Sequence, residues 1–328
     1  MQQLIPKTYS LKDMNPDYPD LPVKGFEKGH HRVPAVNPDF VWNFDMIRDF
    51  LIWERLRTES QDNLVLTGPT GCGKTERVEQ WAAHFGIPCW FMAGSPDATL
   101  MDVRGYNTVI SDGAGGSTML FIDGPATAPL RAGGGFLIVN EADHCGPLLQ
   151  GMNDIKTGWE IPETEEVLPC PTGGNFGLIL TMNTNGTGDH RAQFSGAQTI
   201  NSSVMSRSYV VECDYLSKDE EVGILQKVCG LPVEMLSKMQ EYAETLRKRY
   251  KADDSTSINA SVDLRVLRRW AITTEMLGAS SAYQNEGGGY RATRDALMRA
   301  NANAQDPVTK AVMMEVFDAK FKPEEFSS

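Results

Sequence analysis

The chain has 328 residues, of which 41% are hydrophobic and 23% are charged, as is usual for a soluble globular protein. Its net charge of −12 argues against a general nucleic-acid coat, because phosphate binding favours a basic face, although a local basic pore remains open. The six cysteines include no Cys-x-x-Cys pair, so we expect reduced thiols. The sequence shows no apolar stretch of membrane-spanning length and no signal peptide, so we expect a cytoplasmic protein with no membrane segment.

The first part of the chain is irregular. Residues 1–30 are rich in Pro, Asp, Lys and Gly with little periodicity, so we interpret them as an extended N-terminal arm. A lead-in interrupted by prolines follows at residues 33–40. Residues 42–57 are predicted to be helical, because apolar side chains recur along one face, namely Phe44, Ile47, Phe50, Leu51 and Trp53. We expect a nucleotide-binding domain over residues 31–215.

The next segment is a complete phosphate-binding loop. Residues 63–67 form an apolar run suited to a buried strand, and helical periodicity follows Thr75. Between them two glycines, a lysine and a hydroxyl stand at G-x-x-x-x-G-K-[ST] spacing. Glycines let backbone N–H groups point at phosphate oxygens, Lys74 brings positive charge to the β- and γ-phosphates, and Thr75 offers a hydroxyl to Mg²⁺. The predicted ATP-binding residues are Gly68, Pro69, Thr70, Gly71, Cys72, Gly73, Lys74 and Thr75.

Beyond the loop, apolar runs alternate with helical stretches. The runs predict core strands at residues 88–92, 136–139, 178–182 and 209–211, and hairpins at 106–122 and 159–167. This alternation implies an α/β fold, a three-layer core around a parallel sheet. From about Leu216 helical periodicity dominates, which predicts a smaller all-helical lid domain over 216–328, with helices that include 264–277 and 308–321.

Polar residues follow two of the predicted core strands. Glu141 comes directly after the strand at 136–139 and is the candidate general base that polarises water for attack on the γ-phosphate. An acid is expected at the position before Glu141, but this position holds Asn140. The Asn140 amide can hold a metal-bound water but brings no negative charge. At the end of the next strand, Asn183 is placed to orient the attacking water; a cap or turn role is the simpler alternative.

These pieces, in this order, resemble the AAA+ ATPases of the MoxR type, and are most similar to the small ATPase subunit of aerobic cobaltochelatase (CobS). The similarity runs from about residue 33 to the end of the chain. The stretch 33–42 resembles the family's lead-in to the nucleotide base. Residues 196–201 and 205–207 resemble the box that holds the arginine finger, and 265–270 resembles the second sensor, an arginine five residues before a tryptophan.

The resemblance implies an ATPase that uses Mg²⁺ and assembles as a hexameric ring. Three residues would act within one subunit, namely Lys74, Glu141 and Asn183. Arg207 would reach into the nucleotide site of a neighbouring subunit. Arg265 would report the nucleotide state to the lid domain. Thr75 and Asn140 would serve the metal. The partner would be a protein with a von Willebrand A (VWA) domain, and a metal chelatase is the narrow version of that role.

The chain departs from the family pattern at two positions. Asn140 replaces an Asp, which bears on metal affinity and turnover, and Ser206 replaces the Asp before the finger. A nucleic-acid motor is the rival function, but the hairpin tips near Asp112 and Glu163 are neutral or acidic, which makes nucleic acid a poor partner. A nucleotide-binding ring that hardly hydrolyses ATP is the third alternative.

Overall fold

A computed structural model describes residues 3–111, 116–184, 197–251, 258, 261–284 and 287–326. The chain packs as two compact units. The first, the α/β unit, comprises Met1–Pro69 and Gly73–Cys213; the second, the helical unit, comprises Thr70–Cys72 and Asp214–Ser328. Within the described ranges, every helix is too short or too polar to cross a membrane.

A five-stranded parallel sheet is the centre of the α/β unit. Its order is β11–β3–β10–β7–β4, with all neighbours parallel. The strands are β3 (Asn63–Thr67), β4 (Cys89–Ala93), β7 (Gly135–Asn140), β10 (Phe176–Met182) and β11 (Ser208–Glu212). Every residue of β3 and β10 is buried, as a parallel sheet covered on both faces requires. The predicted core strands and the α/β fold class are confirmed.

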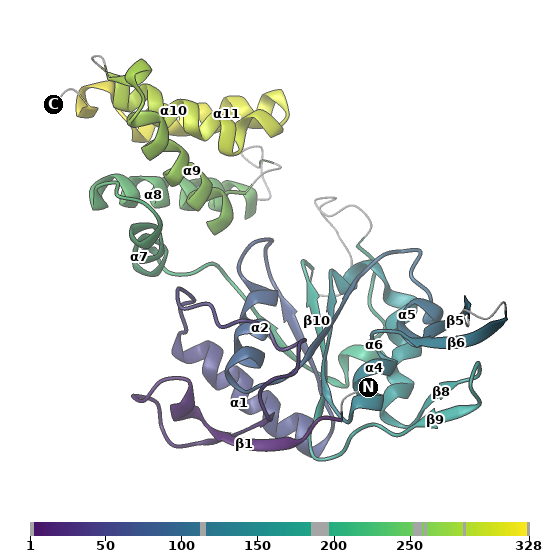
Figure 1. Cartoon of the computed structure of the whole chain (residues 1–328). Helices are drawn as coiled ribbons and strands as arrows, with labels where there is room; N and C mark the ends of the chain where they lie inside the picture. Colours follow the sequence, from purple (N-terminus) through teal and green to yellow (C-terminus); the bar gives the residue numbers. More distant parts are fainter. Residues whose placement is uncertain are drawn as a thin grey trace. The chain divides into compact units, whose positions relative to one another are not determined.

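Helices cover both faces of this sheet, α1 and α2 on one and α4 and α5 on the other (Figure 1). The aromatic ring of Trp81 in α2 stacks on Phe50 in α1 with 4.8 Å between centroids, and Trp53 packs 5.5 Å from Phe136 of β7. The predicted three layers are therefore present. The helices are α1 (Phe44–Glu59), α2 (Lys74–His84), α3 (Leu100–Arg104), α4 (Thr127–Ala132), α5 (Gly146–Met152) and α6 (Ser202–Met205), with short 3₁₀ turns η2 (Ala142–His144) and η3 (Asn153–Lys156).

The N-terminal residues differ from the extended arm expected. Strands β1 (Pro6–Ser10) and β2 (Pro22–Phe26) pair antiparallel, with the 3₁₀ turn η1 (Leu11–Asp13) after β1. The Tyr9 hydroxyl donates to the Phe26 carbonyl at 2.7 Å, and both side chains are buried. The apolar residues that make this contact are 17 positions apart, so no local periodicity announces them.

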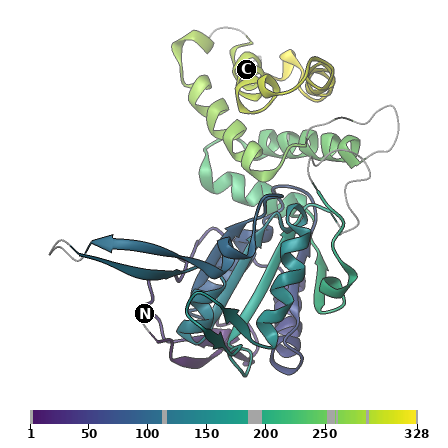
Figure 2. The same cartoon turned by 90° about the vertical axis from the view of Figure 1, so that its right-hand side faces the viewer.

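Two hairpins extend from the α/β unit, as predicted. Strands β5 (Gly105–Ser111) and β6 (Ser117–Asp123) form the longer one, which projects from the unit in Figure 2. Strands β8 (Trp159–Ile161) and β9 (Glu166–Leu168) form the shorter one. The tip around Asp112 lies outside the described residues. The two hairpins interrupt the α/β alternation without joining the central sheet.

The helical unit packs around an aromatic core. Trp270 is fully buried, with Tyr242 at 5.1 Å and Phe321 at 5.7 Å between ring centroids. The sequence missed α10, whose buried residues include three alanines, a glycine and a threonine and whose first turn holds two glycines. The helices are α7 (Lys218–Val228), α8 (Val233–Lys251), α9 (Leu264–Gly278), α10 (Gly288–Ala300) and α11 (Pro307–Lys320), with 3₁₀ turns η4 (Ser281–Tyr283), η5 (Ala302–Ala304) and η6 (Pro323–Phe326).

Candidate nucleotide site

The phosphate-binding loop connects β3 to α2. Gly68 has φ +140°, and a Cβ built there would lie 2.1 Å from the carbonyl oxygen of Cys213, so a side chain does not fit. Gly73 has φ +84° and is the N-cap of α2 in the left-handed conformation. A Cβ on Gly73 would meet no atom within 4 Å, so this glycine serves the backbone conformation. The loop shape depends on both positions.

The N-terminus of α2 is suited to an anion. No side chain caps this helix of 11 residues. Its first N–H groups and the helix dipole favour negative charge, and open space lies beside Gly73. A phosphate group fits these residues in both charge and space.

Lys74 joins the loop to the end of β10. Its ammonium donates to the carbonyls of Gly68 and Pro69 at 2.7 and 2.9 Å, and to Oδ1 of Asn183 at 3.1 Å. The lysine is buried, and a buried cation requires such partners. Two predicted site residues, Lys74 and Asn183, are therefore in direct contact.

Thr75 and Asn140 form the second contact at this edge of the sheet. The Thr75 hydroxyl donates to Oδ1 of Asn140 at 2.7 Å, and the Thr181 hydroxyl donates to the same oxygen at 3.2 Å. Because its proton is committed to Asn140, Thr75 presents oxygen lone pairs to its surroundings. Hydroxyl and amide oxygens suit Mg²⁺. No cluster of three or more His, Cys, Asp or Glu suited to a metal occurs in the ranges described, so protein ligation would rest on oxygens such as these.

Glu141 follows β7 in an unusual backbone conformation. Its φ of 53° and ψ of 44° are left-handed, and its side chain is exposed. Such a conformation costs a residue with a side chain about 1–3 kcal/mol and often occurs at functional sites. The strained turn places an exposed carboxylate beside Asn140.

Asp143 has a different environment, which sequence reasoning missed. The residue is fully buried, and its Oδ2 accepts from the backbone N–H groups of Asn183 and Thr184 at 3.1 and 3.0 Å and from the Thr184 hydroxyl at 3.0 Å. Asp143 therefore fixes the turn that carries Asn183. Asp143 lies only two residues after Glu141, and burial and hydrogen bonds distinguish the two acids in the structure.

The two predicted arginines are exposed. Arg207 immediately precedes β11, and its carbonyl accepts from the Asn63 N–H at 2.9 Å. The Arg207 guanidinium forms no ion pair with any residue in the described ranges. In the helical unit, Arg265 donates twice to Oδ2 of Asp263, at 3.0 and 2.8 Å. Arg191, the next candidate for the finger if Arg207→Ala keeps full activity, lies outside the described residues.

Comparison with known proteins gives matches to a family profile, to curated sequences and to solved structures. The profile of the AAA domain (dynein-related subfamily) matches residues 63–195. Uncharacterized proteins of Staphylococcus haemolyticus and Staphylococcus epidermidis are each 26% identical over 211 residues, which cover 62% of this chain and 76% of theirs. The structure of NtrX from Brucella abortus covers 86% of this chain and 69% of its own at 11% identity, with a TM-score of 0.46. The matched profile and the strand order give the chain an α/β P-loop AAA+ fold.

Proposed function

We propose that the chain hydrolyses ATP as a subunit of an AAA+ motor of the MoxR type. One observation carries this proposal: two contacts, Lys74 to Asn183 and Thr75 to Asn140, converge where parallel strands end beside a phosphate-binding loop. The carboxyl ends of parallel strands are where open α/β sheets bind their ligands. The matched AAA domain profile supports the same reading.

Each residue has a role that follows from its chemistry. The loop N–H groups and the Lys74 ammonium bind phosphate oxygens, and Asn183 orients the attacking water. Thr75 and Asn140 would hold Mg²⁺, which when bound supplies positive charge at the phosphates. Glu141 accepts the proton of the water. Asp143 is unsuited to that task, because it is fully buried and its Oδ2 accepts from two backbone N–H groups and the Thr184 hydroxyl.

The assembly is the second part of the proposal. Arg207 is exposed without an ion pair to the described residues, as expected of a finger that acts on a neighbour's γ-phosphate. We infer a hexameric ring that remodels a partner protein, with a VWA-domain protein as the partner. A more specific form of this proposal is that the ring is the ATPase part of a metal chelatase.

Hydrolysis is tested with Glu141→Gln in the full chain. The wild-type protein should hydrolyse MgATP, and the variant should lose about 10²- to 10⁴-fold in rate while it still binds ATP, because only proton transfer is removed. Glu165→Gln is the matched control, since Glu165 is also exposed and also left-handed, at φ 55°.

Two results would overturn the proposal. Equal rates for Glu141→Gln and wild type would remove Glu141 from catalysis, and the absence of turnover in wild type would leave a nucleotide-binding scaffold. A large rate increase on addition of single-stranded DNA would instead favour the nucleic-acid motor.

A further inference from the structure

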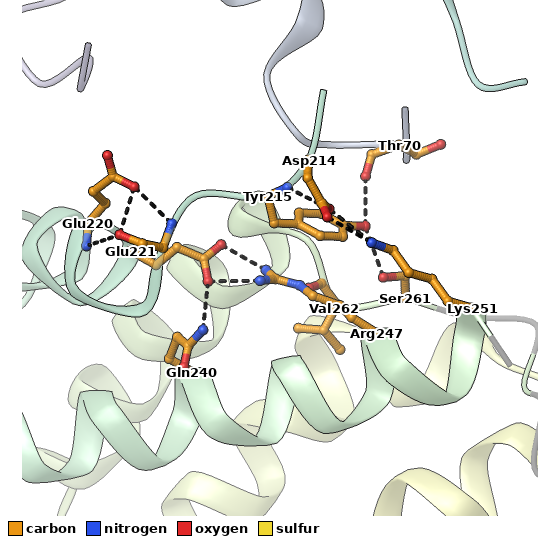
Figure 3. Close-up of polar contacts among 11 residues, drawn as sticks. Thr70, Asp214, Tyr215, Glu220, Glu221, Gln240, Arg247, Lys251, Ser261 and Val262 are labelled. Carbon is orange, nitrogen blue, oxygen red and sulfur yellow. Dashed lines mark hydrogen bonds and ion pairs between the residues drawn. The ribbon is translucent and has the colours of Figure 1, made fainter. Parts of the chain in front are cut away.

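Three residues of the phosphate-binding loop, Thr70–Cys72, belong to the helical unit. One of their contacts within this unit is drawn in Figure 3: the hydroxyl of Tyr215 lies 3.2 Å from the carbonyl oxygen of Thr70 and donates to it. Tyr215 precedes α7, and 145 residues separate it from Thr70. The loop is therefore held by a side chain that belongs to no part of the phosphate-binding motif.

The direction of this hydrogen bond is fixed by the chemistry of the partners. A carbonyl oxygen only accepts, so the single phenol proton of Tyr215 points at Thr70. Ser261 lies 3.0 Å from the same phenol oxygen and must donate to it. Burial raises the pKa of Tyr215 to about 12, so the phenol keeps the proton that it donates at neutral pH. The order of donation is Ser261 to Tyr215 to Thr70.

A buried arginine packs against the face of the Tyr215 ring. The Arg247 guanidinium lies 3.9 Å from the ring centroid, a cation–π contact. The same guanidinium forms two 2.8 Å hydrogen bonds to the Glu221 carboxylate and donates Nε to the Val262 carbonyl at 2.7 Å (Figure 3). The side chains of Arg247 and Glu221 are only 6% and 1% exposed. A buried bidentate pair of this kind fixes the guanidinium, and with it the ring.

A second contact falls on the next residue of the loop. A Cβ built on Gly71 would lie 2.0 Å from Oδ2 of Asp263, so the Asp263 carboxylate packs directly on Gly71. Asp263 is itself fixed as the N-cap of α9, where its other oxygen accepts from the Val266 N–H at 2.9 Å. Within the helical unit, Thr70 and Gly71 are thus each contacted by a side chain that has a defined position.

We infer that Tyr215 is a positioning residue, which holds the phosphate-binding loop at Thr70 in its nucleotide-ready shape. The inference rests on the proposed nucleotide function of the loop and adds a residue that lies outside the motif. Because a loop held in shape loses less conformational entropy on binding, Tyr215 raises nucleotide affinity and has little effect on the chemical step. The expected signature is a change in KM for MgATP at nearly constant kcat.

The test compares Tyr215→Phe with Tyr242→Phe in the full chain. Both substitutions remove a phenol hydroxyl that donates to a backbone carbonyl, at 3.2 Å to Thr70 and at 3.1 Å to Met313, and only the first carbonyl belongs to the loop. One lost hydrogen bond corresponds to about 2- to 10-fold in affinity. Tyr215→Phe should raise KM for MgATP and Kd for MgADP by that factor with kcat unchanged. Tyr242→Phe should lower the melting temperature and leave both constants as in wild type.

Hydrogen exchange of the peptide that contains residues 68–75 provides a readout that needs no nucleotide. Tyr215→Phe should accelerate its exchange, and Tyr242→Phe should not. The inference would be overturned if the loop of Tyr215→Phe exchanged at the wild-type rate. Equal shifts of KM in the two variants would also overturn it. If wild type binds no nucleotide but Tyr215→Phe still accelerates hydrogen exchange of the loop, the proposed nucleotide function fails. The inference that Tyr215 holds the loop in shape would then still be supported.

Discussion

Two pairs of polar residues, one pair in each compact unit, lie in different environments. In the α/β unit, Glu141 and Arg207 are exposed, and Glu141 adopts a strained backbone conformation. In the helical unit, Arg247 and Glu221 are buried and satisfy each other beside an aromatic core. Exposed polar groups without internal partners are available to substrate or to another subunit, whereas a buried pair is committed to the fold. Substitution of Glu141 or Arg207 should therefore change the rate of hydrolysis, and substitution of Arg247 should change stability.

The largest effect is expected at Arg207. A finger arginine stabilises charge in the transition state, so Arg207→Ala should lower turnover by about 10³- to 10⁵-fold without loss of stability or ATP binding. Arg55→Ala is the control, since Arg55 is exposed on α1. ATPase assays and calorimetric titration check both. Loss of folding in Arg207→Ala would break the contrast between the two units.

Mixed rings refine this first prediction. Rings that contain Arg207→Ala and Glu141→Gln subunits should regain part of the activity, because some interfaces then pair an intact Glu141 with an intact Arg207. Mixed rings that form but remain inactive at every ratio would argue against a finger that acts between subunits.

The next largest effect is expected in stability, when one partner of the buried pair Arg247–Glu221 is removed. Arg247→Ala leaves the Glu221 carboxylate buried without its partner and should lower the free energy of unfolding by about 3–5 kcal/mol. Lys251→Ala breaks the exposed pair with Asp214 and should change it by about 0–1 kcal/mol. Denaturant titration followed by circular dichroism measures both. Similar losses in the two variants would mean that burial does not govern this unit.

Lys74 lies between these extremes, because it is buried within the nucleotide site. Lys74→Ala should weaken MgATP binding by about 1.5–3 kcal/mol, or roughly 10- to 100-fold, as expected for lost charge-assisted contacts. Lys24→Ala is a suitable control, since the Lys24 ammonium also donates to a loop carbonyl, that of Gly173 at 2.6 Å. Titration calorimetry is the measurement. Unchanged ATP affinity in Lys74→Ala would refute the site.

The smallest effect is expected at Asn140. Asn140→Asp keeps the oxygen that accepts from Thr75 and Thr181 and adds a negative charge, so the Mg²⁺ concentration for half-maximal ATPase should fall by about fivefold. Asn153→Asp adds the same charge outside the cluster and should leave this concentration unchanged. A constant or higher Mg²⁺ requirement in Asn140→Asp would show that the amide already suits its role.

Local patterns carried much of the fold. The core strands β3, β7 and β10 were predictable because each is a continuous apolar run, and the hairpins because polar turn residues separate two such runs. Several elements were not predicted, among them β1, β2 and α10. The pairing of β1 with β2 joins distant residues, and the buried residues of α10 include three alanines, a glycine and a threonine in place of large apolar side chains.

The candidate site divides in the same way. The sequence by itself determined the loop, its lysine and hydroxyl, and the polar residues at the ends of β7 and β10, because their spacing is local. Only the tertiary structure decided which of these groups meet. Lys74 and Asn183 are 109 residues apart, and Tyr215 and Thr70 are 145 apart. It also separated buried Asp143 from exposed Glu141, two acids that differ little in sequence. Contacts between distant residues depend on how strands and helices stack, and that stacking leaves no periodic trace along the chain.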